Sequence, residues 1–211
     1  MLNLLKIYNN LLRQYGQQKW WPLAGAGQGI AGYDWRFEVI VGAILTQMIS
    51  WTNVEKALAN LIAAGKLSPN GVSSLPSRKL AILIRPSGYY RQKTRKLKNF
   101  VDFLNTRHNG SLDRLAALSV PRLRQELLGI HGIGEETADS IILYAFKKPS
   151  FVIDAYTRRL LQDYNISFPR YADYQNFFQT NLPRSVRLWN EYHALIVRRG
   201  KDAGQVKKYR R

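Results

Sequence analysis

The feature that most constrains the fold is a short glycine-containing turn between two helix-forming segments. Residues 121–128 and 135–146 both have helical patterns, and the turn between them contains Gly132-Ile133-Gly134. Such a turn exposes backbone N–H groups at the start of the second helix, where the helix dipole also favours an anion. An apolar run, Phe151-Val152-Ile153, then leads to Asp154. This stretch therefore predicts a phosphate-binding turn followed by a carboxylate.

Helical periodicity continues along the rest of the chain, and alternating strand patterns are nearly absent. Ser111 can cap a helix that begins at Leu112, and Pro121 suits a first helical turn. We therefore expect an all-α fold. Besides an N-terminal helix with apolar residues from Leu4 to Leu12, the pattern predicts helices over 36–46, 52–64, 80–84, 93–104, 112–118, 154–162, 171–180 and 187–198.

We expect two helical domains with a cleft between them. One is discontinuous, combining residues 1–33 with residues 148–211, so that the N-terminal helix packs with the C-terminal helices. The other, residues 34–147, is a helical bundle ending in the hairpin at about 121–146. The Gly- and Ala-rich residues 25–33 are predicted to be a flexible connection. Apolar packing must hold the discontinuous domain together, and we expect its core to contain Leu161, Tyr164, Phe177, Phe178, Leu182, Trp189 and Leu195.

The charge balance favours a polyanionic partner. The 211 residues include 32 Lys and Arg against 14 Asp and Glu, giving a formal net charge of +18. Such an excess in a chain of otherwise globular composition indicates nucleic acid rather than a merely basic surface. The basic tail, residues 200–211, can add sequence-independent attraction to phosphate. Five basic residues cannot all share one helix face, so we expect some to contact phosphate and the rest to be solvated: Arg91, Lys93, Arg95, Lys96 and Lys98.

The absence of cysteine excludes disulfides, thiolate zinc sites and cysteine-ligated iron–sulfur clusters. Three histidines, His108, His131 and His193, are too scattered to suggest a metal site, and we expect neither metal nor cofactor. No apolar run reaches membrane-spanning length, and the N-terminal helix lacks the apolar core and cleavage site of a signal peptide. We expect a cytoplasmic, nucleoid-associated monomer with no membrane partner.

The hairpin, its following helix and Val152-Ile153-Asp154 resemble the helix-hairpin-helix DNA glycosylases of the endonuclease III superfamily. Residues 42–47, Gly-Ala-Ile-Leu-Thr-Gln, resemble the early helix and glutamine-containing loop of that superfamily. The resemblance runs over nearly the whole chain. It implies the helix-hairpin-helix glycosylase fold, a role in base excision repair, and double-stranded DNA containing damaged bases as the partner.

One position separates this chain from the bifunctional members of that superfamily. There, a catalytic lysine lies two residues after the second hairpin glycine and 18 residues before the aspartate; here that position is Glu136. A carboxylate cannot form the Schiff base that a lyase step needs. The missing cysteines point to a smaller branch, the 3-methyladenine DNA glycosylase III type. Three stretches resemble it further: Trp20-Trp21-Pro22, Leu45-Thr46-Gln47 followed by Trp51, and residues 85–93, Arg-Pro-Ser-Gly-Tyr-Tyr-Arg-Gln-Lys.

The resemblance assigns Asp154 the catalytic role. Its carboxylate would stabilise the oxocarbenium-like sugar and orient or deprotonate the attacking water. It can also cap the helix that follows, and the two roles are compatible. The resemblance further implies a base pocket in which Trp20 and Trp51 are the stacking faces, Trp21 and Pro22 the walls, and Lys201 a pocket lysine. The alternative is that the tryptophans are core residues and Lys201 is solvated.

The resemblance also implies residues that contact DNA. Gly132, Ile133 and Gly134 would offer their backbone to phosphate, with Thr137 in the same helix start. Gln47 either fills the gap left in the duplex or caps a local turn. The carboxylates of Glu135 and Glu136 would weaken DNA binding, so we expect those two side chains to point away from it.

The leading hypothesis is a monofunctional glycosylase that flips and hydrolytically removes alkylated purines such as 3-methyladenine. Indole is the best cation–π face, so a tryptophan-lined pocket would prefer a positively charged methylated purine. Two alternatives stay open: an endonuclease III-like glycosylase/AP lyase acting on oxidised or mismatched bases, and a non-catalytic DNA-damage-binding protein.

Overall fold

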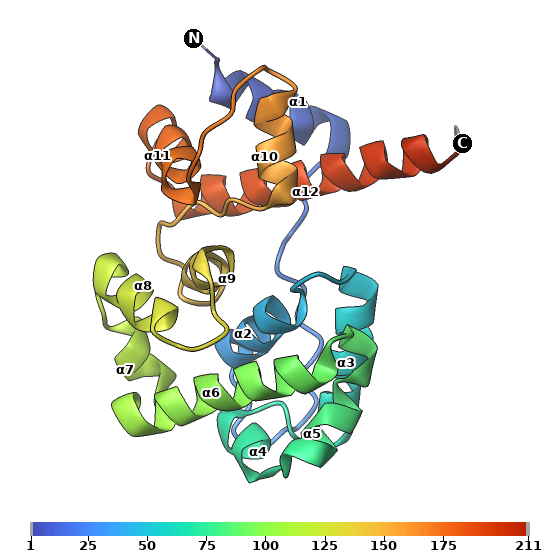
Figure 1. Ribbon diagram of the computed structural model, residues 1–211, viewed down its shortest axis with the longest axis vertical. Coiled ribbons are helices and arrows are strands. Elements are labelled where there is room, and N and C mark those ends of the chain that lie inside the picture. Colours follow the sequence, from blue (N-terminus) through green and yellow to red (C-terminus); the bar gives the residue numbers. More distant parts are fainter. Residues whose placement is uncertain (1, 210–211) are drawn as a thin grey trace. The chain divides into compact units, whose positions relative to one another are not determined.

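The computed structural model describes residues 2–209, and the side chains of residues 2–203. Its described residues are helical, with no strand among them, which confirms the all-α prediction. The chain divides into two compact units (Figure 1). We call Trp21–Phe146 the central unit, and Met1–Trp20 with Lys147–Arg211 the terminal unit.

The boundary near the N-terminus lies earlier than the sequence predicts. Residues 21–33 belong to the central unit rather than to the discontinuous domain, because both ends of this loop are fixed there. Trp21 packs on the bare backbone of Gly42, where an added Cβ would lie 2.6 Å from the indole. The buried carboxylate of Glu38 accepts hydrogen bonds from Ala24 N (2.6 Å), Gly25 N (2.9 Å) and the Tyr33 hydroxyl (2.6 Å). The predicted flexible connection is therefore held at both ends.

The terminal unit contains α1 (Leu4–Tyr15), α10 (Ala155–Gln162), α11 (Tyr171–Asn181) and α12 (Val186–Tyr209), and α12 packs against both α1 and α10 (Figure 1). Its core is aromatic: Phe151 stacks on Phe178 with ring centroids 4.2 Å apart, and Tyr192 meets both edge-on. The predicted core is largely buried, but Tyr164 is 44% exposed because it follows the last turn of α10. The side chains of Lys207, Lys208, Arg210 and Arg211 in the predicted basic tail lie outside the described residues.

In the central unit, α2 is buried over nearly its whole length and packs against α3, α6 and the helical segment that follows the hairpin. The helix α4 was not predicted; Ser68 caps it, and Pro69 begins it. The elements are α2 (Trp35–Leu45), α3 (Trp51–Ala63), α4 (Pro69–Ser74), α5 (Ser77–Leu83), η1 (Arg85–Ser87), α6 (Tyr90–His108), α7 (Leu112–Ala116), α8 (Val120–Leu128), α9 (Glu135–Ser140) and the π-helical turn η2 (Ile141–Ala145). None of the helices within residues 2–209 is long and apolar enough to cross a membrane.

Gly200 provides a test of the packing between α10 and α12. An alanine Cβ at this position would lie 2.0 Å from Cδ1 of Tyr156, so the Tyr156 ring or one of the two helices must shift. In an open helix, Gly→Ala stabilises by about 1 kcal/mol. Here we expect Gly200→Ala to destabilise by about 1–3 kcal/mol in urea denaturation, because overpacking outweighs the propensity gain.

The double variant Gly200→Ala/Tyr156→Ala separates the two effects. Removing the ring removes the clash, so alanine at 200 should then be neutral or stabilising relative to Tyr156→Ala alone. Equal costs of Gly200→Ala in both backgrounds would show that the ring is not the cause.

Candidate active site and nucleic-acid interface

Asp154 lies at the junction between a buried extended segment and α10. Phe151, Val152 and Ile153 are each at most 1% exposed, and Ile153 N donates to the Tyr171 hydroxyl (3.2 Å). Asp154 then caps α10, with Oδ1 accepting from Thr157 N at 2.7 Å. The segment is therefore anchored on both sides of the carboxylate, and the backbone itself positions the side chain.

The surroundings of Asp154 keep its carboxyl group ionised. Burial alone would raise its pKa, but the interaction with His193 and the hydrogen bonds from Thr157 outweigh burial, so the pKa lies below its ordinary value. Nε2 of His193, on α12, lies 3.6 Å from Oδ2. The side chain of Asp154 is 13% exposed, so this largely buried carboxylate can still be reached from the surface. Such a group can stabilise positive charge that develops next to it.

The predicted hairpin forms a turn between α8 and α9. Gly132 has φ +97°, a conformation that favours glycine, and its Cα packs on the Lys96 stem. Gly134 is exposed and caps α9, so the N–H groups of that first turn have no partner within the helix. The N–H of Ile133 donates to Ile130 O (3.0 Å), and its side chain is buried. Ile133 anchors the turn, and the accessible backbone is that of the two glycines, with Gly134 exposed and Gly132 partly exposed.

An arginine of α8 partly neutralises the acidic residues at the start of α9. Arg124 pairs with Glu135 at 3.2 Å and with the buried carboxylate of Asp139 at 2.9 Å. Glu136 is exposed at the position where bifunctional relatives would carry lysine. The pairing draws the Glu135 side chain back toward α8, as expected for a carboxylate beside an anion-binding turn.

Gln47 connects the end of α2 to the hairpin. Its amide nitrogen donates to the Thr137 hydroxyl (2.9 Å) and to Gly132 O (3.3 Å), and its oxygen accepts from the Lys96 ammonium. In this arrangement Gln47 and Thr137 stabilise the turn, and the Gln47 side chain lies against the hairpin.

Three lysines of α6 have roles that the sequence analysis did not predict. Lys93 is 2% exposed, and its ammonium donates to Leu45 O (2.8 Å) and Ser87 O (2.6 Å). Lys98 donates to three carbonyls at the end of α4. With Lys96 bound to Gln47, all three ammonium groups donate to oxygens of the protein itself; Lys93 is buried, and Lys96 and Lys98 are partly exposed. Arg91 and Arg95 are exposed.

Two of the predicted pocket tryptophans contact each other within the central unit. Trp21 and Trp51 meet edge to face, with centroids 5.0 Å apart and planes at 89°, and Trp21 also contacts Tyr144 of η2 at 5.4 Å. Trp51 begins α3, and its indole N–H donates to Glu55 at 2.9 Å. Both indoles are partly exposed, and Pro22 beside them is exposed. Trp21 therefore braces Trp51 rather than acting only as a wall.

Trp20 and Lys201 lie together in the terminal unit. The Lys201 ammonium is 6.0 Å from the centroid of the Trp20 ring, at the outer limit for a cation–π contact. Lys201 is exposed and Trp20 partly exposed. The structure thus pairs two of the predicted pocket residues with each other in a different unit from Trp21, Pro22 and Trp51.

Two exposed apolar residues in a left-handed backbone conformation were missed from the sequence. Met48 is 86% exposed with φ +56°, and Tyr89 is 61% exposed with φ +44°. Non-glycine residues in this conformation cost about 1–3 kcal/mol and cluster at functional sites. The glycine before Tyr89 marks a turn at the start of α6 in the sequence. The left-handed conformation of Met48 and Tyr89 could not be predicted, because residue type does not determine φ.

The comparisons with known proteins identify the family of the chain. Residues 41–183, more than half of the chain, match the model for HhH-GPD superfamily base excision DNA repair proteins, in which HhH denotes helix-hairpin-helix. The chain belongs to the HhH-GPD superfamily. It is therefore a DNA glycosylase of base excision repair. The chain is 41% identical over 198 residues to “Putative DNA repair glycosylase MJ1434” of Methanocaldococcus jannaschii, covering 92% of this chain and 85% of that protein.

Other HhH-GPD relatives and solved structures extend the comparison. Endonuclease III of Sulfolobus acidocaldarius is 29% identical over 164 residues, covering 76% of this chain and 71% of that protein. The H. pylori 3-methyladenine DNA glycosylase MagIII, solved bound to 1,N6-ethenoadenine, superimposes with a TM-score of 0.76 at 25% identity, covering 96% of this chain and 99% of that chain. An endonuclease III–DNA covalent intermediate gives 0.72 at 21% identity, covering 93% and 85%, which shows the shared fold.

His193 generates a testable prediction about Asp154. His193→Leu removes the polar partner and keeps burial, so the pKa of Asp154 should rise, as ¹³C NMR titration of the carboxyl would show. Because the wild-type pKa lies below the unfolded value, Asp154 stabilises the fold above about pH 4, and this contribution is lost as pH falls through the folded pKa. The acid-dependent part of the unfolding free energy should therefore shrink in the variant.

An unchanged pKa of Asp154 in His193→Leu would mean that the hydrogen bonds from Thr157 alone keep the group ionised.

Proposed function

We propose that this protein is a monofunctional DNA glycosylase that flips alkylated purines such as 3-methyladenine out of duplex DNA and hydrolyses the N-glycosyl bond. The observation that carries the proposal is the ionised carboxylate of Asp154, fixed at the start of α10 while position 136 holds no amine. We further propose that the enzyme acts as a monomer and is associated with the nucleoid.

Hydrolysis without strand cutting follows from the chemistry of position 136. A lyase needs an amine that attacks the sugar carbon and forms a Schiff base, and Glu136 cannot do this. The lowered pKa of Asp154 makes it a weak proton acceptor at neutral pH, because an effective general base titrates near the working pH. Its main contribution would therefore be electrostatic: stabilising the oxocarbenium-like sugar and orienting a water.

An alkylated purine is the substrate that requires least catalytic assistance from such a site. Ring alkylation gives the base a positive charge, so the base leaves without protonation by the enzyme. The edge-to-face pair of Trp21 and Trp51 offers an indole face for such a cation. The 3-methyladenine glycosylase from H. pylori, similar over nearly its whole length, supports the same substrate class.

The duplex would bind across the hairpin. The exposed backbone of Gly132 and Gly134 would contact phosphate, while Met48 and Tyr89 project apolar side chains where base pairs can be separated. Gln47 and Thr137 would hold the hairpin for this contact, and Gln47 would enter the duplex only after exchanging its present partners.

The direct test is base release from methylated duplex DNA. Asp154→Asn should lower single-turnover base release by at least about 10²-fold, since a preorganised charge is lost. Asparagine is as good an N-cap as aspartate, so the fold should be retained. Asp163→Asn, which removes an exposed carboxylate, is the matched control and should release base at the wild-type rate.

Borohydride trapping on abasic DNA tests the absence of a lyase step. No covalent adduct should form with the wild type. A trapped adduct would mean that another amine supplies lyase chemistry and would favour the endonuclease III-like alternative. Tight binding without product from any alkylated substrate would favour a damage-binding protein.

The stacking role of Trp51 predicts a second kinetic effect. Trp51→Ala should weaken substrate binding about tenfold or more, because base–aromatic stacking contributes roughly 1–3 kcal/mol. The loss should be larger for cationic 3-methyladenine than for neutral 1,N6-ethenoadenine. Trp35 begins α2 as Trp51 begins α3, so Trp35→Ala is the matched control. An equal loss of substrate affinity in both variants would mean that Trp51 has only a structural role.

A further inference from the structure

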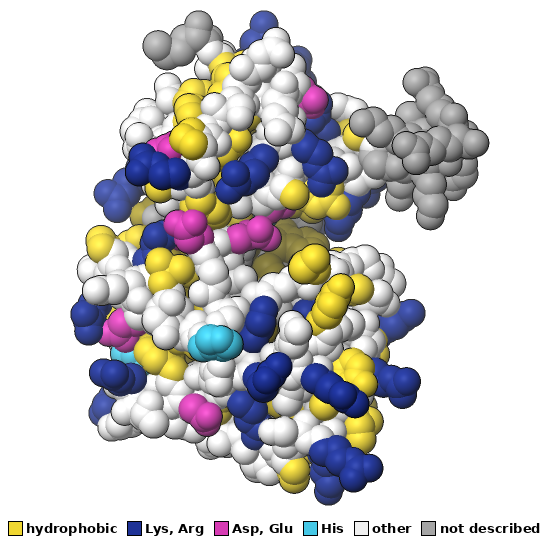
Figure 2. Space-filling model, viewed as in Figure 1, with side chains coloured by type: hydrophobic (Ala, Val, Ile, Leu, Met, Phe, Trp, Pro, Cys, Tyr) yellow, Lys and Arg dark blue, Asp and Glu magenta, His cyan; other side chains and the backbone are white. Residues whose placement is uncertain are grey.

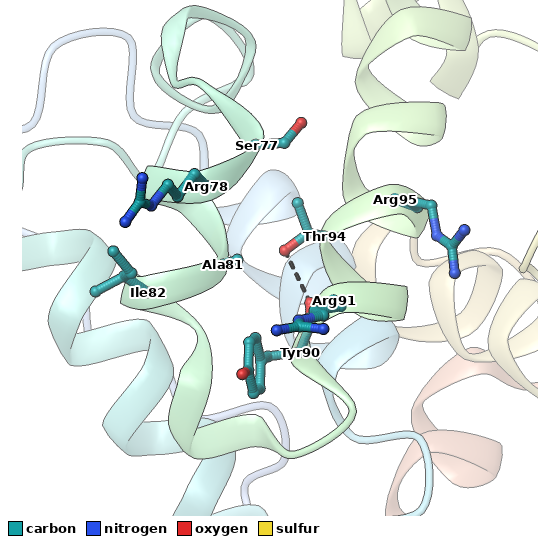
Figure 3. A pocket seen from close by; sticks show the side chains of 8 residues that line it. All are labelled: Ser77, Arg78, Ala81, Ile82, Tyr90, Arg91, Thr94 and Arg95. Carbon is teal, nitrogen blue, oxygen red and sulfur yellow. Dashed lines mark hydrogen bonds between the residues drawn. The ribbon is translucent and has the colours of Figure 1, made fainter.

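A pocket lined by neither Asp154 nor the tryptophans lies between α5 and α6. It has a volume of about 490 Å³. Figure 3 shows Tyr90 and Arg91 between the two helices, with Arg78 and Arg95 extending to opposite sides. Its lining comes from α5 (Ser77, Arg78, Ala81 and Ile82) and from α6 (Tyr90, Arg91, Thr94 and Arg95).

The charge around this pocket is positive and uncompensated. Arg78, Arg91 and Arg95 are exposed, and within the described residues none of the three pairs with a carboxylate. No acidic residue lines the pocket. On the face of the central unit seen in Figure 2, dark-blue Lys and Arg side chains lie among yellow hydrophobic ones. The ligand that complements the three arginines is an anion with at least two charged groups.

Part of the pocket lining is apolar, which limits the kinds of anion that fit it. Ile82 is 61% exposed, and Ala81 and the Tyr90 ring are partly exposed beside it. Phosphates of an intact duplex need protruding cations, not an apolar hollow, and the stacked bases of a duplex have no free face to fill one. An unpaired nucleotide offers both a flat apolar face and flanking phosphates, which is how single-stranded DNA is bound elsewhere.

The pocket is connected to the hairpin through α6. The Lys96 stem packs under Gly132, and Asn99 Nδ2 donates to His131 O at 3.0 Å. Arg91 lies eight residues before Asn99 on the same helix, a rise of about 12 Å. That rise corresponds to roughly three to four nucleotides of one strand in a duplex. A strand held at the hairpin can therefore reach the pocket within a few nucleotides.

We propose that the α5–α6 pocket binds an unpaired nucleotide of a DNA strand that leaves the duplex close to the hairpin. The base stacks on Tyr90 and Ile82, and the flanking phosphates pair with Arg78, Arg91 and Arg95. The enzyme would then bind best where double- and single-stranded DNA meet. This inference rests on the proposed binding of the duplex across the hairpin.

Fluorescence anisotropy with two kinds of probe tests the proposal. One is a short blunt duplex containing an abasic-site analogue; the other is the same duplex with an oligo-dT extension, on either the 5′ or the 3′ side. The wild type should bind one extended probe about tenfold tighter than the blunt probe, the gain expected from stacking. Arg91→Gln/Arg95→Gln, Tyr90→Ala and Ile82→Asp should each reduce this preference, while affinity for the blunt probe changes little.

Arg107→Gln/Arg114→Gln removes the same charge from exposed positions outside the pocket and should keep the preference. Equal wild-type affinity for all probes would overturn the proposal, as would pocket variants that weaken blunt and extended probes alike. Unchanged binding of every DNA probe by the pocket variants would also overturn it, and would leave an acidic peptide with an apolar anchor as the fitting ligand. Asp154→Asn should retain the preference, so failure of the catalytic proposal is seen separately.

Discussion

The buried ammonium of Lys93 is the contact on which the proposed DNA-binding side of the central unit depends. It donates to the last carbonyl of α2 and to a carbonyl of η1, two segments that no backbone hydrogen bond joins directly. Burial, with a smaller contribution from Lys96, lowers its pKa to about 8, so the charge persists at neutral pH at a cost in stability. Without it, two carbonyl groups would lack their partner, a loss of about 1–3 kcal/mol if they stay buried.

The positions of the two segments that Lys93 joins explain why the cost of burying its charge is tolerated. Gln47 and Met48 follow the carbonyl at the end of α2, and Tyr89 follows the carbonyl in η1. Met48 and Tyr89 both have a backbone conformation that is unfavourable for their side chains. Strain of this kind persists only where the surroundings overdetermine the backbone. A buried cation between the two segments fixes both ends at once, so the exposed apolar side chains are held in place before any DNA binds.

Much of the helical architecture could be predicted because apolar periodicity and caps are local signals. Ser111 and Pro121 mark helix starts that the structure contains. The destinations of long polar side chains could not be predicted in the same way. Lys93, Lys96 and Lys98 look like surface charges in the sequence, yet each donates to an oxygen of the protein itself. Their acceptors are backbone or amide oxygens up to 49 residues away, which no sequence pattern identifies.

The candidate site shows the same division between local and tertiary information. Asp154 was recognisable because an apolar run, a carboxylate and a helix start follow one another. The braced pair of Trp21 and Trp51 was not, because it depends on Gly42 allowing an indole onto the backbone of α2. Likewise, Glu38 gives no sign in the sequence that it holds the loop carrying Trp21 and Pro22.

The electrostatics of Asp154 connect the site to the class of base that it would release. A carboxylate with a lowered pKa is a stable anion and a poor base, so it stabilises a cation more readily than it removes a proton. A neutral base such as adenine needs protonation to leave, and the carboxyl of Asp154, already ionised at neutral pH, cannot supply that proton. A base that is already positive needs no proton, and only the sugar cation requires stabilisation as the bond breaks. If Asp154 is the catalytic group we propose, the same interactions that keep it ionised would favour substrates whose leaving group carries its own charge.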